Sequence, residues 1–231
     1  MSTDVTPGAA LRIDEHTLIL RPSLCPELQL RVIDRNSPLG RAIRRHGLYA
    51  VHEVLAGLRF PPHWGYAFAG GQALARFVLD HPERVAGRRV LDIGTGSGLV
   101  AIAAARAGAL RVTALDRDPL ALEASRNNSY LNGFSVETEV GEIQTFDAGR
   151  FDLLLASEVF YEDDGILRWL EGPGLAGGAS VLLADPGRGI LMPDRARELA
   201  RYRSRTEPDL EWVEQAVIYG LGPVSGHSRS V

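Results

Sequence analysis

The segment Val90–Gly98, with the sequence VLDIGTGSG, combines a carboxylate with three closely spaced glycines. A short apolar run precedes the aspartate and an alanine-rich run follows the last glycine, so the segment predicts a turn between a buried strand and a helix. The glycines permit tight turning and let backbone N–H groups approach a ligand without interference from a Cβ atom. The residues expected to contact that ligand are Asp92, Gly94, Gly96 and Gly98.

A second carboxylate, Asp116, ends the next predicted strand, 24 residues after Asp92. At that position it can accept hydrogen bonds from both hydroxyls of a ribose. A dinucleotide would bring an anionic pyrophosphate to the turn, whereas S-adenosylmethionine would bring an ammonium and a sulfonium. Asp92 repels the first and attracts the second, and the spacing GxGxG differs from the GxGxxG of dinucleotide sites. The pair favours S-adenosylmethionine as the cofactor, with NAD-dependent oxidoreduction as an alternative.

The third predicted strand ends at Val140-Gly141-Glu142, on the edge of the sheet where ligands of such folds bind. The carboxylate of Glu142 is expected to accept a hydrogen bond from the amino group of adenine. An isolated acid in a loop is also a common solvated surface residue, so this assignment depends on the position of Glu142 at the strand end.

The loop after the fourth predicted strand, Ser157–Asp164, is acidic and aromatic. Methyl transfer is an in-line displacement, so a protein must align the nucleophile, remove its water and keep it unprotonated. A lysine acceptor has an ordinary pKa of about 10.4. A carboxylate and an aromatic ring beside the sulfonium can bind and guide such an amine, and Glu158 and Tyr161 are the predicted catalytic residues. The Asn-Pro-Pro-Tyr motif of adenine and glutamine methyltransferases is absent, which disfavours those acceptors.

From Arg88 onward, strand-like and helix-like segments alternate, which is typical of a parallel sheet with helices on its faces. We therefore predict an α/β fold with a Rossmann-like, mostly parallel sheet of seven strands and helices on both faces. Predicted strands cover 90–92, 111–115, 136–140, 151–156 and 180–184, with one or two closing strands in 211–219; predicted helices cover 72–80, 99–107 and 119–132.

The first 60 residues predict a small N-terminal cap. Residues 27–34 have apolar side chains at period two and indicate a strand, and apolar residues between 39 and 58 recur at helical spacing after Ser37 and Pro38. We expect the cofactor-binding domain to span 61–223 and a tail to span 224–231.

Composition narrows the possible functions. The 231 residues carry a net charge of -4, which provides no basic field for nucleic acid, and no apolar run is long enough to cross a membrane. All 25 basic residues other than histidine are arginine, so lysine-based covalent catalysis is excluded. With Cys25 as the single cysteine and no cluster of metal ligands, we expect a cytoplasmic, metal-free monomer.

Several segments together resemble a known family: PELQLRVID, PPHWGYAFAGGQALARFVLDHPERVAGRRVLDIGTGSGLVAIAAARAGA, ALDRDPLALEASRNN, SEVFYED and LLADPGR. They are similar to bacterial relatives of the lysine methyltransferase of the electron transfer flavoprotein beta subunit. The resemblance runs from about Cys25 to Tyr202. Its most specific parts are GGQALAR, the Glu-x-x-Tyr loop and DPGR.

The resemblance implies a seven-stranded enzyme that methylates protein lysines with S-adenosylmethionine. It places Trp64 at the cofactor together with the strand-end acids, and it matches Glu158 and Tyr161 to the acidic-x-x-aromatic motif of the family. Ser157, where glycine is common in relatives, is also expected to border the cofactor. The implied acceptor is the flavoprotein beta subunit or a ribosomal protein, and methylation of a small nicotinamide-like amine is the alternative. A binding module that keeps the cofactor fold without turnover is a further reading.

Overall fold

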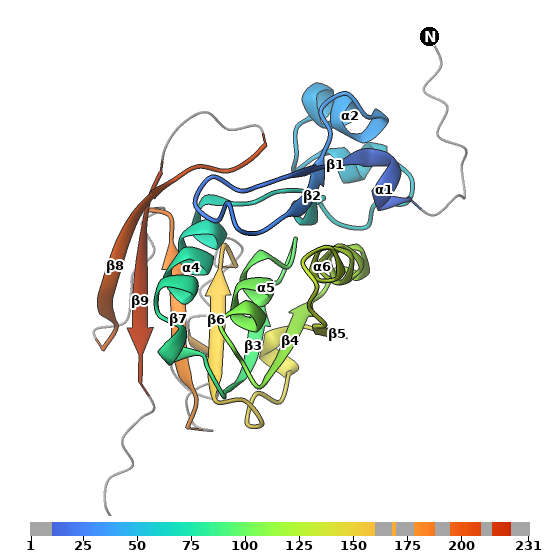
Figure 1. Cartoon of the computed structure of the whole chain (residues 1–231). Helices are drawn as coiled ribbons and strands as arrows, with labels where there is room; N and C mark the ends of the chain where they lie inside the picture. Colours follow the sequence, from blue (N-terminus) through green and yellow to red (C-terminus); the bar gives the residue numbers. More distant parts are fainter. Residues whose placement is uncertain (1–10, 160–167, 170–177, 188–194, 209–213, 223–231) are drawn as a thin grey trace, which may run out of the picture.

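The computed structural model describes residues 11–159, 168–169, 178–187, 195–208 and 214–222. Within these ranges, seven strands form one sheet in the order β5-β4-β3-β6-β7-β9-β8 (Figure 1). The strands are β3 (Arg89–Ile93), β4 (Arg111–Asp116), β5 (Glu137–Val140), β6 (Leu153–Ser157), β7 (Ser180–Asp185), β8 (Arg197–Ser204) and β9 (Glu214–Leu221). Strands β3 to β7 are parallel, and β9 runs antiparallel to both of its neighbours. The predicted seven-stranded, mostly parallel α/β fold is confirmed.

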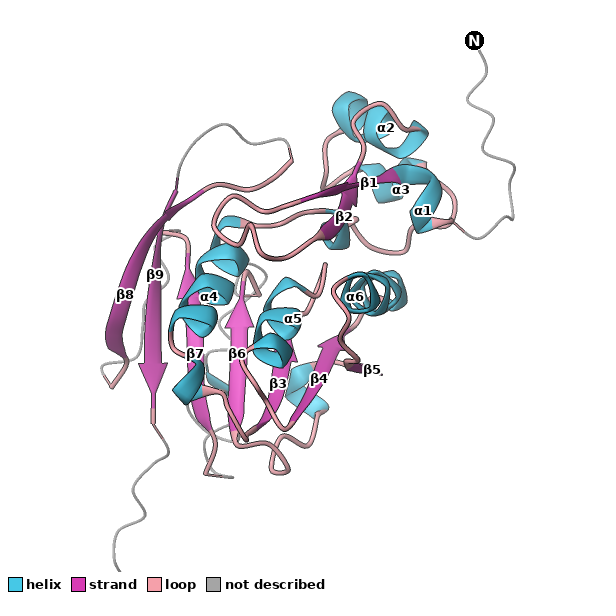
Figure 2. Ribbon diagram, viewed as in Figure 1, coloured by secondary structure: helices cyan, strands magenta, loops and turns pink. Residues whose placement is uncertain are grey.

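The central strands are buried on both faces because successive side chains point to opposite sides of the sheet. In β3, Val90 packs into the cluster that includes Leu74, Phe77 and Ile102, whereas Leu91 packs into a second cluster on the other face. The helices of the catalytic part are α4 (Ala69–Asp80), α5 (Leu99–Arg106) and α6 (Pro119–Leu131), with 3-10 turns η2 (Pro82–Arg84) and η3 (Ile143–Thr145). Figure 2 shows α4 and α5 in front of the central strands.

The N-terminal part contains a two-stranded antiparallel sheet and short helices. Its elements are α1 (Ile13–His16), β1 (Thr17–Leu20), β2 (Leu30–Ile33), α2 (Pro38–His46), α3 (Val51–Val54) and the 3-10 turn η1 (His63–Gly65). The predicted strand is confirmed as β2, and the hydroxyl of Ser37 caps α2 as expected. The apolar residues between 39 and 58 do not lie on one helix: α2 ends at His46, and Gly47 after it has a φ of +87° that side-chain-bearing residues rarely adopt. Strand β1 and helix α1 were not predicted.

The N-terminal part packs directly on the catalytic part. Leu28, Leu30 and Val32 belong to the same buried cluster as Phe77 of α4. The side chain of Gln72 adds polar contacts to this interface. Its amide nitrogen donates to the carbonyls of Ala67 and Arg205, and its oxygen accepts from the backbone N–H of Leu24. A domain boundary at residue 60 stays a prediction.

The closing strands are only partly anticipated by the pattern. The segment predicted at 211–219 overlaps β9 (Glu214–Leu221), whereas β8 has no counterpart in the prediction. Its sequence, RELARYRS, carries four charged side chains and lacks the β-branched residues typical of strands. It lies at the edge of the sheet, where charged residues are tolerated because one side of the strand faces solvent.

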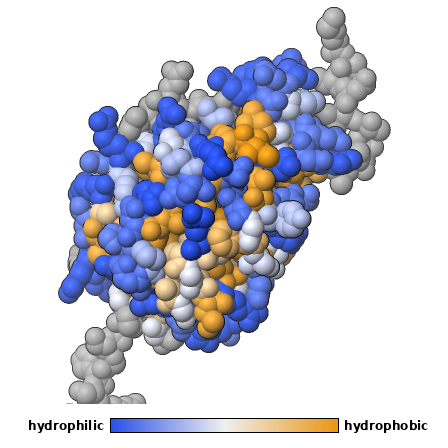
Figure 3. All heavy atoms as spheres, viewed as in Figure 1, coloured by the Kyte–Doolittle hydropathy of each residue, from blue (hydrophilic) through white to orange (hydrophobic). Residues whose placement is uncertain are grey.

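Among the described residues, no helix is both long and apolar enough to cross a membrane. The space-filling view shows mainly hydrophilic residues around α2 (Figure 3), in agreement with the exposure of Arg41, Arg44 and Arg45 on that helix. The buried side of α2 carries Leu39 and Ile43, so the helix is amphipathic.

Candidate active site

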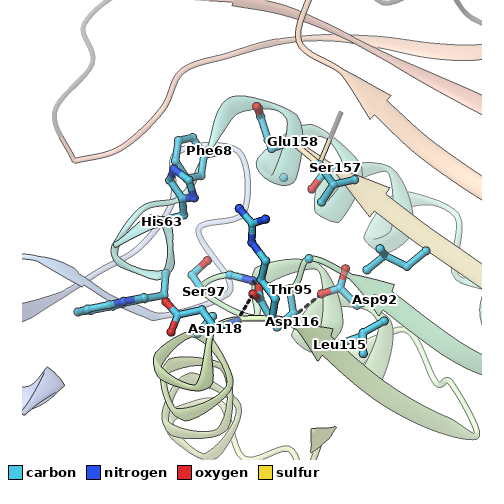
Figure 4. Close-up of a pocket in the computed structure, with 18 of the residues that line it drawn as sticks. His63, Phe68, Asp92, Thr95, Ser97, Leu115, Asp116, Asp118, Ser157 and Glu158 are labelled. Atoms are coloured by element: carbon cyan, nitrogen blue, oxygen red, sulfur yellow. Dashed lines mark hydrogen bonds between the residues drawn. The ribbon is translucent and has the colours of Figure 1, made fainter. Parts of the chain in front are cut away.

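A pocket of about 570 Å³ lies at the carboxyl ends of β3, β4 and β6, where parallel sheets bind their ligands. Its lining combines the glycine turn, the acids that end the strands and aromatic residues from the N-terminal part. Figure 4 shows several of these side chains around the cavity. Of the residues predicted for the site, the pocket is lined by Trp64, Asp92, Gly94, Gly96, Asp116, Glu142, Ser157 and Glu158.

Two predicted residues are not found in this lining. Gly98 lies behind it, in a left-handed conformation with a φ of +82°, and a Cβ there would meet the backbone of Ser125 in α6 at 2.8 Å. Gly98 therefore lets the turn pack against α6, whereas a Cβ at Gly96 would make only ordinary van der Waals contacts, at 3.9 Å from the carbonyl oxygen of Gly94 and 4.0 Å from that of His63. Tyr161 lies outside the described residues. A direct contact of Gly98 or Tyr161 with cofactor or substrate stays a prediction.

The carboxylate of Asp92 is 2% exposed and organises the glycine turn from within. Its Oδ2 accepts hydrogen bonds from the hydroxyl of Thr95 at 2.7 Å and from the backbone N–H of Ala101 at 3.1 Å. Burial raises the pKa of Asp92 to about 7, and the nearby charge of Asp116 adds to this, although the two hydrogen bonds oppose it. A cation beside Asp92 would favour its ionised form.

Asp116 ends β4 and tightens the turn from the opposite side. Its two oxygens accept from the backbone N–H groups of Gly96 and Asp118, each at 3.0 Å. Burial raises the pKa of Asp116, and these hydrogen bonds counteract the shift. The next residue, Arg117, lies over the ring of Phe60, 5.0 Å from its centroid. The β4 end is therefore covered by a residue from the boundary with the N-terminal part.

Glu142 is exposed at the pocket rim, where it precedes η3. Trp64, in contrast, is completely buried and packs in an apolar cluster with Ile33, Leu39 and Ala121. Glu142 lines the pocket from the end of β5, and Trp64 lines it from η1. Trp64 thus fixes the N-terminal part against α6 while bordering the cavity.

Ser157 and Glu158 follow the central strand β6 directly into the pocket. Glu158 adopts a φ of +58°, a left-handed conformation that costs a non-glycine residue on the order of 1 kcal/mol. This conformation brings its Oε1 to 2.8 Å from the backbone N–H of Gly70 in the first turn of α4. A Cβ at Gly70 would lie 2.8 Å from that oxygen, so a larger residue there would displace the end of the Glu158 side chain. Gly70 and Gly71 lie in the first turn of α4, and the N–H of Gly70 holds the carboxylate.

The sequence did not indicate an aromatic wall formed by Tyr49, His63 and Phe68. The ring of His63 makes edge contacts with Tyr49, at 5.6 Å between centroids, and with Phe68, at 5.9 Å. Figure 4 shows His63 and Phe68 on the side of the pocket opposite Asp116 and Thr95. Rings and a carboxylate facing one cavity can bind an ammonium group through cation–π and charge interactions. The clustering of aromatics between 49 and 68 was the available signal.

The residues around the turn fit S-adenosylmethionine. At Gly96 only ordinary van der Waals contacts surround the Cβ position, so a ligand can come close to the backbone. The oxygens of Asp116 stand beside it for a ribose, and Asp92 supplies negative charge for an ammonium or a sulfonium. Across the described part of the chain, no group of three histidine, cysteine, aspartate or glutamate side chains is arranged to hold a metal ion.

We expect the affinity for S-adenosylmethionine to rise by up to about tenfold between pH 6 and pH 8, because ionisation of a carboxylate with a pKa of about 7 goes from mostly absent to mostly complete over that range. Binding near pH 7 should release a proton from Asp92, which calorimetry in buffers of different ionisation enthalpy measures. The free protein should become less stable as the pH rises from about 4 to about 7, because Asp92 ionises at a lower pH in the unfolded chain than in the folded protein. In Asp92→Asn both effects should vanish; their persistence would assign them to another group.

Comparison with known proteins gives a consistent result. The family model described as ribosomal protein L11 methyltransferase (PrmA) matches residues 68–158. The electron transfer flavoprotein beta subunit lysine methyltransferase of Rattus norvegicus is 37% identical over 213 residues, which cover 87% of this chain and 79% of the relative. The human enzyme of the same name is 34% identical, with 72% and 61% covered. A ribosomal protein L11 methyltransferase of Symbiobacterium thermophilum is 36% identical over 47% of this chain and 36% of its own length.

Solved structures support the fold. A protein described as an RNA methyltransferase from Pyrococcus horikoshii superposes with a TM-score of 0.55 at 17% identity, covering 78% of this chain and 98% of that one. The identity of the rat relative over most of the chain shows the family directly. The chain is a methyltransferase that uses S-adenosylmethionine. It belongs to the family of the electron transfer flavoprotein beta subunit lysine methyltransferases.

Proposed function

We propose that this chain is a protein-lysine N-methyltransferase whose acceptor is the electron transfer flavoprotein beta subunit or a ribosomal protein. The observation that carries the proposal is the carboxylate of Glu158, which the N–H of Gly70 holds at the pocket. The aromatic wall lines the same cavity. An aliphatic amine suits this combination of charge and rings. The names of the relatives support a protein acceptor of these two kinds.

The roles of the side chains follow from their placement. Asp116 would hold the ribose, Glu142 the adenine amino group, and the turn at Gly94 and Gly96 the methionine portion of the cofactor. S-adenosylmethionine, when bound, supplies a methyl group activated by a sulfonium. Glu158 would accept a hydrogen bond from the lysine amine and orient its lone pair, and Tyr161 is proposed to assist there.

The aromatic wall would exclude water from the amine. Removing water favours the neutral, nucleophilic form of a group whose ordinary pKa is about 10.4. The aromatic wall lowers the pKa of the amine by excluding water, whereas the carboxylate of Glu158 raises it, because a carboxylate favours the charged amine. We propose that the carboxylate binds the ammonium first, that the ammonium then gives up one proton to solvent, and that the rings exclude water from the neutral amine that attacks the methyl group.

The test is transfer of a labelled methyl group to purified flavoprotein beta subunit and, in parallel, to ribosomal protein L11. We expect mass increments of about 14 Da per methyl on lysine-containing peptides. The enzyme has no lysine, so it contributes no lysine signal of its own. If neither protein is labelled and a nicotinamide-like amine is, the chain acts on small molecules and the proposal is wrong.

We also propose that the protein is a cytoplasmic monomer. Its single cysteine, Cys25, is fully buried, and burial raises the pKa of the thiol to about 12, so it is protected from disulfide exchange between chains. Light scattering should give a mass near the 25.1 kDa of one chain. A mass of twice that value would contradict the monomer.

A further inference from the structure

We propose that Asn128 of α6 couples the N-terminal hairpin β1–β2 to the cofactor turn, so that seating of the hairpin sets the affinity for S-adenosylmethionine. Asn128 is completely buried. Its Nδ2 donates to the carbonyl of Ser97 at 2.8 Å, and its Oδ1 accepts from the backbone N–H of Arg31 in β2 at 2.7 Å. One side chain therefore joins both segments. The inference rests on the assignment of the turn as the cofactor site.

A second contact between the hairpin segment and α6 lies about one helical turn further along the helix. Asn132 accepts from the N–H of Gln29 at 2.9 Å and donates to the carbonyl of the same residue at 2.7 Å. Residues four apart in a helix rise about 6 Å, and residues two apart in a strand span about 6.6 Å, so two asparagines match two backbone positions of one strand edge. The edge of the hairpin that faces away from β1 is thereby closed by side-chain amides.

The side-chain amide of Asn128 uses both its oxygen and its nitrogen, so its orientation cannot change without breaking a contact. If the hairpin shifts on α6, the side chain must lose either the N–H of Arg31 or the carbonyl of Ser97. Ser97 lines the pocket and belongs to the glycine turn between β3 and α5. An unsatisfied buried polar group is costly, so the hairpin and the turn should prefer one joint arrangement.

Through this link the N-terminal part would influence the affinity for the cofactor. The same α6 surface carries Ala121 and Ala124, which pack with Ile33 and Leu39 of the N-terminal part. A protein acceptor that contacts the hairpin would stabilise its seating and raise the affinity for the cofactor. By linkage, bound cofactor would raise the affinity for that acceptor by the same factor.

The experiment measures the dissociation constant for S-adenosylmethionine by calorimetry, well below the unfolding temperature, in a double-mutant cycle. Asn132→Ala loosens the hairpin without touching the turn or the pocket, and we expect binding about threefold weaker; Asn128→Ala breaks the link itself, with binding about tenfold weaker. In the Asn128→Ala background, Asn132→Ala should have no further effect. Asn127→Ala, on the exposed face of the same helix, is the control.

Asn132→Ala could lower the melting temperature and leave the dissociation constant for S-adenosylmethionine at its wild-type value. This result would show that the contacts only stabilise the fold, and it would overturn the proposal. An equal effect of Asn132→Ala in both backgrounds would overturn it as well, because Asn128 would not be the link. If Asn128→Ala does not fold, the comparison of Asn132→Ala with Asn127→Ala decides. Failure of the site assignment is distinguishable, since Asp116→Asn would then also bind the cofactor normally.

Discussion

Replacing Glu158 with glutamine should lower the rate of methyl transfer by about 10² to 10³-fold while leaving cofactor affinity within about twofold of wild type. Glutamine keeps an oxygen that can accept from the N–H of Gly70, so the strained conformation at the end of β6 has the same support. The negative charge that would attract and orient an amine is lost. Single-turnover transfer and calorimetry measure the two quantities separately.

The control for this experiment is Glu123→Gln, which removes a carboxylate from the exposed face of α6. Its transfer rate should equal that of wild type. A Glu158→Gln variant that keeps more than half of the wild-type rate would remove Glu158 from the chemistry. A variant that no longer binds S-adenosylmethionine would show instead that Glu158 is part of the cofactor site.

Replacing Asp116 with asparagine should weaken binding of S-adenosylmethionine by about 10- to 100-fold. The carboxylate can accept from ribose hydroxyls while it holds the N–H groups of Gly96 and Asp118, and an amide offers one acceptor in place of two. A hydrogen bond to a charged group contributes roughly 1.5–3 kcal/mol, which corresponds to this range of affinity.

The effect should appear in the dissociation constant and in KM for the cofactor, with a smaller change in kcat at saturation. Glu123→Gln again provides the matched loss of one charge at a distant position. A dissociation constant unchanged in Asp116→Asn would mean that the ribose lies elsewhere, and the orientation of the cofactor in the pocket would have to be reversed.

Local patterns were sufficient to predict the catalytic sheet and the acids at its edge. Strands β3, β4 and β6 are short apolar runs with Asp92, Asp116 and Ser157 at or one residue before their carboxyl ends, and the parallel arrangement brings these ends together regardless of the details of packing. Because the position of a strand end follows from the strand itself, the residues there could be assigned to one pocket before any contact was known.

The rest depends on contacts between distant segments. Asn128 and Asn132 look like ordinary polar residues of a helix, and only the packing of β2 on α6 gives their amides partners. The aromatic wall likewise requires the turn at Tyr49 and the η1 segment to come together at the pocket. The contact of Gly70 with Glu158 could not be predicted either, because the two residues are 88 positions apart in the chain.

A crystal structure with S-adenosylhomocysteine bound is the most direct test of the central claim, that the β3, β4 and β6 ends form one site in which Glu158 faces the transferred methyl group. We expect the ribose on Asp116 and the sulfur directed toward Ser157 and Glu158. A ligand bound with its sulfur directed away from Glu158, or outside this pocket, would contradict the account.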